Sequence, residues 1–214
     1  MAVLITGANR GIGAALLSHY RQEGRAAFGT ARKPVGDQLP LDVTSAESQH
    51  ALARRLNGMP ISLLVCNAGV YPDKGQSLDR GYPPALWQAA FAVNVTGVFL
   101  TIQSLLPNLR AATGKIAILS STMASDANAP GGSYIYRASK AAALNLGRNL
   151  AADLSPEGIA VGIYHPGWVK TDMGGPGAEI APAQSVAGLA ARFAALSPAT
   201  TGCFEAWDGS PIPF

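Results

Sequence analysis

The sequence predicts an α/β fold: a single doubly wound parallel sheet with a shortened crossover after the second strand. Two observations predict it. Apolar runs such as VLI, LLV and IAIL are continuous rather than alternating, which is typical of parallel strands covered on both faces. Longer stretches of helical character separate these runs, which is the pattern of a sheet built from βα units. No linker, repeat or low-complexity tract interrupts the chain, so residues 1–214 are expected to form one domain.

The expected elements alternate along the chain. Seven strands are expected, at Ala2–Thr6, Ala26–Thr30, Gln38–Leu41, Ser62–Cys66, Lys115–Leu119, Ala160–His165 and Cys203–Trp207, because each run is short and mostly apolar. Helices are expected in the longer segments between them, at Ile12–Glu23, Ala46–Leu56, Pro84–Leu106, Tyr134–Leu154 and Ala183–Ala195.

Two connections depart from this simple alternation. Only Ala31 to Gln38 separates the second and third strands, which leaves room for a loop but not for the helix that normally joins parallel strands. The segment from Gly81 to Leu109 carries no charge, which raises the alternative of a membrane span. Pro83, Asn94 and other polar or proline residues interrupt it, so a buried helix and no membrane association are expected.

The composition excludes several classes of protein. Charged residues make up 14% of the chain and hydrophobic residues 48%, which excludes a disordered protein. A net charge of +3 without a Lys/Arg run does not favour a nucleic-acid partner. Cys66 and Cys203 lie far apart, and the histidines have no ligand-spaced partners, so neither a disulfide framework nor a metal site is expected. The start MAVLITGANR has no basic region before its apolar run, which favours a reduced, cytoplasmic protein over a secreted one.

A glycine-rich segment lies between the first strand and the first helix. Gly7, Gly11 and Gly13 would give tight turning, close backbone approach and free N–H groups at a helix N-terminus, which a dinucleotide pyrophosphate requires. The alternative is an ordinary strand-to-helix turn rich in glycine. The position after the first strand of an alternating chain favours the dinucleotide site.

Further motifs follow in order at the carboxyl ends of the expected strands, where open α/β sheets bind ligands. They are Asn67-Ala68-Gly69 after the fourth strand, Ser120-Ser121 after the fifth, Tyr136-Arg137-Ala138-Ser139-Lys140 on the following helix, and Pro166-Gly167-Trp168-Val169-Lys170-Thr171 after the sixth.

With these motifs the chain resembles the short-chain dehydrogenase/reductase family, a Rossmann-fold family, over nearly its full length. It is most similar to the carbonyl reductase subgroup typified by the sniffer protein and bacterial C-factor. The resemblance implies catalytic roles for Asn94, Ser121, Tyr136 and Lys140. It implies cofactor contacts at Gly7, Asn9, Arg10, Gly11, Ile12, Gly13, Arg32, Asp42, Val43, Asn67, Ala68, Gly69, Tyr136, Lys140, Pro166, Gly167, Val169 and Thr171. Two departures are the missing crossover helix and a brief Gly/Pro-rich loop after Met173, where family members place a substrate lid.

The chemistry expected of the site is proton donation to a carbonyl that receives a hydride. Tyr136 and Lys140 are four residues apart on one helix face, so we expect the ammonium to lower the tyrosine pKa from its ordinary value near ~10. Tyr134 faces elsewhere and is expected to pack. Ser121 is the expected oxyanion donor, with a strand-end cap as the alternative. A serine hydrolase using Ser121 and His165 is disfavoured because no G-x-S-x-G turn is present.

The resemblance assigns two further roles. It places Lys140 on the nicotinamide ribose hydroxyls. It gives Asn94 the task of kinking its helix and holding a water connected to the lysine. The alternative for Asn94 is a helix-bend residue without a catalytic role.

The favoured cofactor is NADP(H), with NAD(H) as the lesser option. No acid follows the second strand until Asp37, whereas NAD sites place a carboxylate there. Arg32 and Arg10 are the expected partners of the extra phosphate, the alternative being that Arg32 and Lys33 are solvated loop charges. Asp42 resembles the family's adenine contact.

These observations together predict an NADPH-dependent reductase of a small, apolar carbonyl or alcohol substrate. The alternatives are an NAD-dependent alcohol dehydrogenase of the same fold and a C-factor-like signalling protein that binds the cofactor with little turnover. A homodimer or homotetramer is expected, because the two long helices carry more apolar surface than one sheet face covers.

Overall fold

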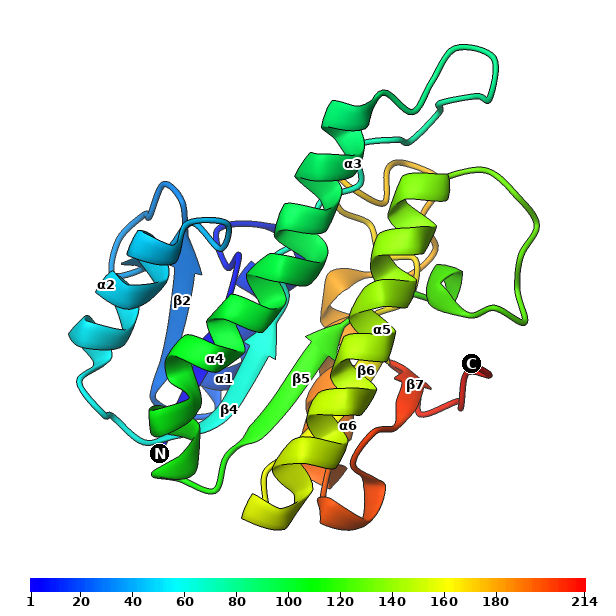
Figure 1. Cartoon of the computed structure of the whole chain (residues 1–214). Helices are drawn as coiled ribbons and strands as arrows, with labels where there is room; N and C mark the ends of the chain where they lie inside the picture. Colours follow the sequence, from blue (N-terminus) through cyan, green and yellow to red (C-terminus); the bar gives the residue numbers. More distant parts are fainter.

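A computed structural model describes residues 1–214 and shows one parallel sheet running through the whole chain (Figure 1). The strands are β1 (Ala2–Ile5), β2 (Ala27–Ala31), β3 (Leu39–Pro40), β4 (Ile61–Cys66), β5 (Lys115–Leu119), β6 (Ala160–His165) and β7 (Phe204–Ala206). Their order in the sheet is β3-β2-β1-β4-β5-β6-β7, and every neighbouring pair is parallel. The predicted α/β fold is confirmed, and no strand end differs from its predicted position by more than one residue.

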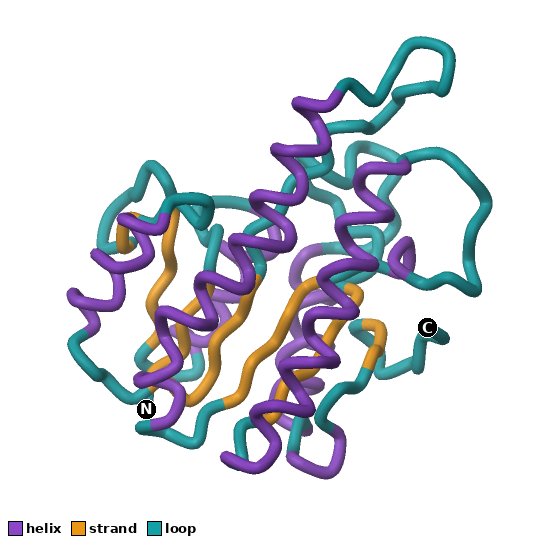
Figure 2. The backbone as a smooth tube through the Cα atoms, viewed as in Figure 1, coloured by secondary structure: helices purple, strands orange, loops and turns teal.

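Helices cover both faces of the sheet, as Figures 1 and 2 show. The helices are α1 (Gly11–Gln22), α2 (Ala46–Leu56), α3 (Pro84–Phe91), α4 (Gly97–Arg110), α5 (Tyr134–Leu154) and α6 (Pro182–Ala195). Apolar side chains of α2, α4 and α5 form one core cluster with the sheet, and those of α1 and α6 form another on the opposite face. The sheet is therefore buried on both sides.

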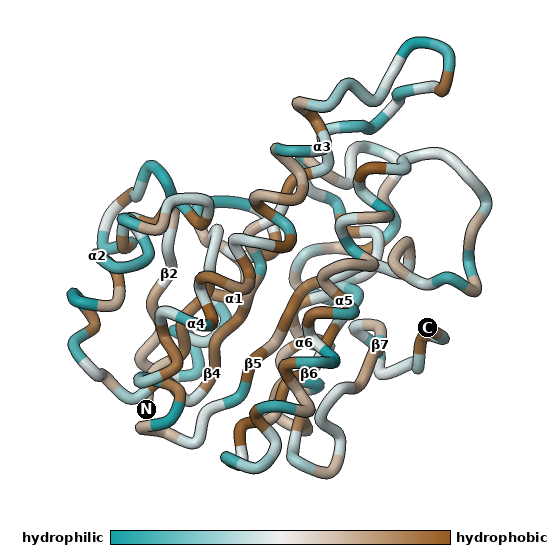
Figure 3. The backbone as a smooth tube through the Cα atoms, viewed as in Figure 1, coloured by the Kyte–Doolittle hydropathy of each residue, from teal (hydrophilic) through white to brown (hydrophobic).

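The strand residues explain why the apolar runs are continuous. In β1, Leu4 belongs to one core cluster, while its neighbours Val3 and Ile5 belong to the other. In β4, Leu64 and Val65 divide in the same way. Successive side chains of a strand point to opposite faces, so a strand covered on both sides needs an apolar residue at every position. The hydropathy colouring of Figure 3 shows these strands as brown segments beneath the helices.

The short connection after β2 is confirmed as a loop. It contains no helix and reverses through Gly36, whose φ is +63°. Thr30 then pairs with Leu39 and Ala31 with Pro40, so β3 is a two-residue edge strand. Because no helix lies over this corner, Arg32 at the end of β2 is left exposed.

The uncharged segment forms one helical run from Pro84 to Arg110, four residues beyond its predicted end. Residues Ala92–Thr96 form a π-helical turn between α3 and α4. By length and composition this run resembles a membrane span, with a mean hydropathy of 1.7. One face nevertheless packs on the sheet through Ile102, Leu105 and Leu109, which identifies it here as a core helix.

The C-terminal segment packs on its own chain. Ile212 packs against the small cluster of Leu144, Ile163 and Phe204. The Phe214 ring stacks on Phe204, and the Arg148 guanidinium lies 3.9 Å from the Phe214 centroid.

Candidate active site

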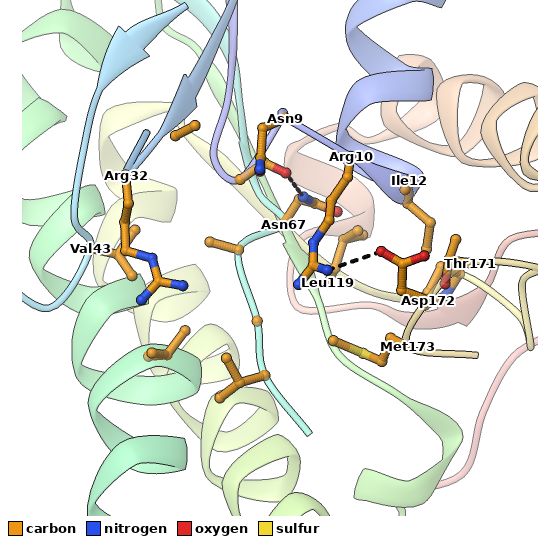
Figure 4. Close-up of a pocket in the computed structure, with 18 of the residues that line it drawn as sticks. Asn9, Arg10, Ile12, Arg32, Val43, Asn67, Leu119, Thr171, Asp172 and Met173 are labelled. Carbon is orange, nitrogen blue, oxygen red and sulfur yellow. Dashed lines mark hydrogen bonds and ion pairs between the residues drawn. The ribbon is translucent and has the colours of Figure 1, made fainter. Parts of the chain in front are cut away.

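The carboxyl ends of the strands open into a cleft of about 750 Å³, which lies within the size range of cofactor sites (Figure 4). Most of the predicted cofactor residues line it: Gly7, Asn9, Arg10, Gly11, Ile12, Arg32, Asp42, Val43, Asn67, Ala68, Gly69, Tyr136, Lys140, Pro166 and Thr171. Gly13, Gly167 and Val169 lie behind its walls. Residues that the sequence analysis did not assign also line it, among them Asp172, Met173 and Leu119.

The glycine loop is shaped by its neighbour strand. Gly7 and Gly11 have φ values of +66° and +57°, a conformation that favours glycine. A side chain at Gly13 would collide with the Asn67 amide and the Gly7 carbonyl. Position 13 therefore requires glycine because the loop packs too closely there for a side chain.

Asn67 and Thr6 hold the two loops together. The Asn67 side-chain amide donates to the carbonyls of Thr6 and Gly7, at 2.8 and 3.0 Å. In return the Thr6 hydroxyl accepts from the backbone amides of Asn67 and Ala68, both at 3.0 Å. The first wall of the cleft is therefore fixed to the end of β4.

The N-terminus of α1 fits a bound phosphate group. No side chain caps this helix, and no acidic residue lies in its first turn. Unpaired N–H groups and the helix dipole favour an anion at such an end. Together with the positive-φ glycines, this cradle fits the pyrophosphate of a dinucleotide.

At the far end of the cleft lie Arg32, Asp42 and Val43. Hydrogen bonds from the Thr44 hydroxyl and amide, at 2.7 and 2.9 Å, hold the pKa of Asp42 below its ordinary value. The Arg32 charge acts in the same direction. Arg32 makes no hydrogen bond or ion pair of its own that would keep it from a ligand phosphate, and Figure 4 shows its guanidinium extending into the cleft.

Arg10 lines the cleft and also forms an ion pair that was not expected. Its Nη1 atom lies 3.0 Å from Asp172 Oδ2, and both side chains are largely exposed. Figure 4 shows this ion pair bridging the glycine loop and the loop after β6, away from Arg32. No local pattern indicates this pair, because its members are 162 residues apart in the chain.

The loop after Met173 is anchored by backbone contacts. Trp168 Nε1 donates to the Gly174 carbonyl at 3.0 Å, and Lys74 Nζ donates to the carbonyls of Met173 and Gly174. Gly167 turns with a φ of +86°, and Val169 pairs with Ile180. Gly167 and Val169 therefore shape the loop that closes this end of the cleft.

Tyr136 and Lys140 lie together on the first turns of α5. Lys140 Nζ is 5.7 Å from the Tyr136 ring centroid and donates to the Leu119 carbonyl at 2.8 Å. Both residues are buried. Burial lowers the pKa of Lys140 to about 8.

The expected lowering of the Tyr136 pKa is wrong for this structure. Burial is the largest effect and raises the pKa of Tyr136 above its ordinary value; the nearby Tyr71 adds to the rise and the Ser121 hydroxyl opposes it. Desolvation penalises the phenolate more strongly than the neighbouring groups favour it. Tyr136 is therefore a protonated phenol, the form that donates a proton.

The two serines after β5 have different tasks. Ser120 Oγ donates to the Lys140 carbonyl at 3.0 Å, which ties β5 to α5. Ser121 Oγ accepts from the Met123 amide at 3.1 Å and lies beside Tyr136. Because Ser120 donates its proton to the Lys140 carbonyl whereas Ser121 lies beside Tyr136, Ser121 is the better oxyanion donor.

Asn94 lies in the π-helical turn and is 1% exposed. Its amide pairs with the backbone of Val70 in both directions and donates to Ser139 Oγ, each bond being 2.9 Å long. A Cβ at Gly69 would lie 3.4 Å from Asn94 Oδ1 and 3.5 Å from Lys140 Nζ. The Asn94 amide and the Lys140 ammonium therefore both lie beside Gly69.

Tyr134 is separate from this group. Its side chain is partly exposed and meets the Tyr82 ring edge-on, with centroids 5.1 Å apart. It packs, as expected.

The residues around Tyr136 include two that the sequence analysis missed. Tyr71 stacks on its ring, and Asp73 accepts hydrogen bonds from the first amides of α5. Their only local signal is that they follow the Asn67-Ala68-Gly69 motif, and the contact itself spans 62 residues.

Comparisons with known proteins agree with this geometry. Residues 1–179 match the family model described as short chain dehydrogenase. The chain is 38% identical over 157 residues to the C-signal protein of Myxococcus xanthus, covering 72% of this chain and 93% of that protein. The NADPH-bound carbonyl reductase from chicken fatty liver superposes with a TM-score of 0.90 at 29% identity, covering 100% of this chain and 98% of that one. The carbonyl reductase Sniffer of Drosophila melanogaster gives 0.93 at 26% identity, covering 100% and 99%. The family model covers most of the chain, and the superposed structures share its whole fold, so the chain is a member of the short-chain dehydrogenase/reductase family.

Proposed function

We propose that this oxidoreductase is an NADPH-dependent reductase of small, apolar carbonyl compounds. One observation carries the proposal. A protonated Tyr136, with Ser121 beside it, and the buried Lys140 line a cleft that also holds an anion cradle and Arg32. The similarity to an NADPH-bound carbonyl reductase supports the same conclusion.

The protein's residues have distinct tasks in this reaction. The bound cofactor supplies the hydride. Ser121 donates a hydrogen bond to the carbonyl oxygen and stabilises the negative charge that develops there. Tyr136 then gives its phenolic proton to that oxygen. Lys140, held by the Leu119 carbonyl, places a positive charge beside the phenol, and the family resemblance assigns it to the ribose hydroxyls of the cofactor.

The walls of the cleft support an apolar substrate. Leu119, Val70 and Met173 line it, and Lys140 is the cation beside Tyr136. A carboxylate or phosphate on the substrate would have no cation there other than the one that supports proton transfer.

A signalling protein with little turnover is the second candidate, because of the similarity to C-signal over 72% of the chain. The complete Ser121, Tyr136 and Lys140 group favours turnover. Incubation with NADPH and a panel of aldehydes and ketones separates the two: oxidation of NADPH supports the reductase, and its absence with every carbonyl supports the signalling protein.

We also propose that the protein is a homodimer or homotetramer. Trp87, Phe91, Val95 and Phe99 follow one another at four-residue spacing along α3 and α4, and Phe99 is 38% exposed. Such spacing places side chains on one helix face. α3 and α4 run beside α5 (Figure 1), and an apolar stripe on them can pack against the same stripe of a second copy across a twofold axis.

Replacement of Tyr136 tests the proton donor. Tyr136→Phe is expected to lower kcat by about 100-fold or more, because general acid catalysis is lost. Tyr134→Phe keeps the ring contact with Tyr82 and should retain most activity. Steady-state NADPH oxidation measures both, and equal losses would contradict the assignment.

Replacement of Arg32 tests the choice of cofactor. A charged hydrogen bond contributes about 1.5–3 kcal/mol, so Arg32→Ala should lower the preference for NADPH over NADH by about ten- to a hundredfold. The measurement is kcat/KM with each cofactor. Arg55→Ala, an exposed arginine on α2, is the matched control. An unchanged preference in Arg32→Ala, or equal use of both cofactors by the wild type, would exclude Arg32 as the selector.

Light scattering at micromolar concentration tests the assembly. The wild type is expected to have at least the mass of a dimer. Phe99→Glu places a charge in the apolar stripe and should give a monomer, because a buried unpaired charge is costly. Gln22→Glu, on the exposed side of α1, should leave the mass unchanged. A monomeric wild type would refute the proposal.

The burial of Lys140 predicts a pH dependence of folding. Its pKa is about 8 in the folded protein and 10.5 by its ordinary value, so between these limits the unfolded chain binds more protons. The free energy of unfolding should therefore rise with pH in that window, by about 1 kcal/mol per unit. Denaturant unfolding of the wild type and Lys140→Met at several pH values isolates the contribution of Lys140. Parallel pH profiles would contradict it.

A further inference from the structure

We propose that Asp73 and Tyr71 are positioning residues for Tyr136: the Asp73 carboxylate fixes the first turn of α5, and the Tyr71 ring fixes the phenol. The role in catalysis rests on the proposed reductase function. The structural part of the proposal does not rest on that function, since it concerns only the order of the first turn of α5 and of the Tyr136 ring.

Asp73 caps the catalytic helix from outside it. Its side chain is fully buried. Oδ2 accepts from the Ile135 amide at 2.9 Å and Oδ1 accepts from the Tyr136 amide at 3.1 Å. Ser133, the residue before the helix, gives no side-chain cap and has a φ of +50°. Asp73 therefore does what a local N-cap residue does in other helices.

The environment makes this cap strong. No lysine, arginine or histidine forms an ion pair with Asp73, so its charge is balanced by the two amides and by the positive end of the helix dipole. A buried carboxylate without such partners is costly. The first turn of α5 and Asp73 consequently hold each other in place.

Tyr71 holds the side chain of the same residue. Its ring stacks on that of Tyr136 with centroids 4.2 Å apart and an interplanar angle of 20°. Its hydroxyl is hydrogen-bonded to Ser133 Oγ. Two contacts therefore hold Tyr136: Asp73 binds its backbone amide and Tyr71 stacks on its ring.

The segment that carries both residues is anchored at the cofactor cleft. Val70, next to Tyr71, is paired with the Asn94 amide in both directions. The position of the Tyr136 phenol is therefore fixed relative to the wall of the cleft, and not by α5 alone. Proton transfer depends steeply on such placement, because small displacements of a reacting group cost large factors in rate.

Asp73→Asn is the central test. The variant keeps one acceptor oxygen and turns an N–H group toward the other amide. Because a hydrogen bond to a charged group is lost, kcat should fall by about 10- to 100-fold, while the dissociation constant of NADPH, measured by fluorescence titration, stays within about twofold. Asp79→Asn, an exposed neighbour on the same loop, is the matched control and should behave as the wild type.

A double-mutant cycle separates positioning from general stability. If Asp73 acts through Tyr136, then Asp73→Asn should cause less than about a twofold further loss in the Tyr136→Phe background. Additive losses would show a structural role unconnected with the phenol and overturn the proposal.

For Tyr71, Tyr71→Leu should lower kcat more than Tyr71→Phe, which retains the stacked ring. Equal losses of kcat in the two variants would overturn the part assigned to the ring.

Two measurements need no turnover, so the proposal remains decidable if the reductase function fails. Hydrogen exchange of the Ile135 and Tyr136 amides should accelerate by about tenfold or more in Asp73→Asn and not in Asp79→Asn. The ring signals of Tyr136 in ¹³C-tyrosine-labelled protein should be sharp in the wild type and broadened or multiple in Asp73→Asn and Tyr71→Leu. Unchanged exchange, or unchanged ring signals, would overturn the positioning role whatever the activity assay shows.

Discussion

The hydrogen bonds between Thr6 and Asn67 join the ends of two neighbouring parallel strands, and the site depends on them. Parallel strands deliver their carboxyl ends to one edge of the sheet, but each end continues into its own loop. The Asn67 amide fixes the glycine loop at the backbone, and the segment that follows Asn67 runs to Tyr71 and Asp73. Asn67 therefore fixes the position of the glycine loop relative to the segment that positions Tyr136.

The chemistry of the site follows from the way its polar groups are buried. Asn94 is matched to Val70 and Ser139, and Lys140 to the Leu119 carbonyl. Each is satisfied by protein, so the site is ordered without a ligand. Removal from water also explains why Tyr136 is a phenol and why Lys140 loses its proton more readily than an exposed lysine.

The sheet, its order and most of the cleft could be predicted because local patterns determine them: continuous apolar runs, glycines at one turn, and motifs after successive strands. Contacts between residues far apart in the sequence could not be predicted in this way. Nothing local connects Arg10 with Asp172 or Asp73 with α5. The pKa of Tyr136 was misjudged because spacing reports which charge is near, whereas burial depends on the whole fold. The family resemblance indicated a kink at Asn94, but its form, a π-helical turn, depends on burial rather than on local helix propensity and could not be predicted.

The edges of the sheet carry a consequence for self-association. At the β3 edge, the Leu41 N–H points into the sheet and donates to the Ala31 carbonyl. Because successive backbone groups of a strand point in opposite directions, the nitrogen of Pro40 faces away from the sheet. Proline has no backbone N–H, so this position cannot donate a hydrogen bond to another strand. At the other edge the chain folds back on β7, with Ala206 donating to Ser210 and Ile212 to Phe204. Neither edge therefore presents the open row of donors that templates intermolecular strand addition. This sheet is protected against edge-to-edge aggregation, and its helical faces are left as the surfaces through which copies can meet.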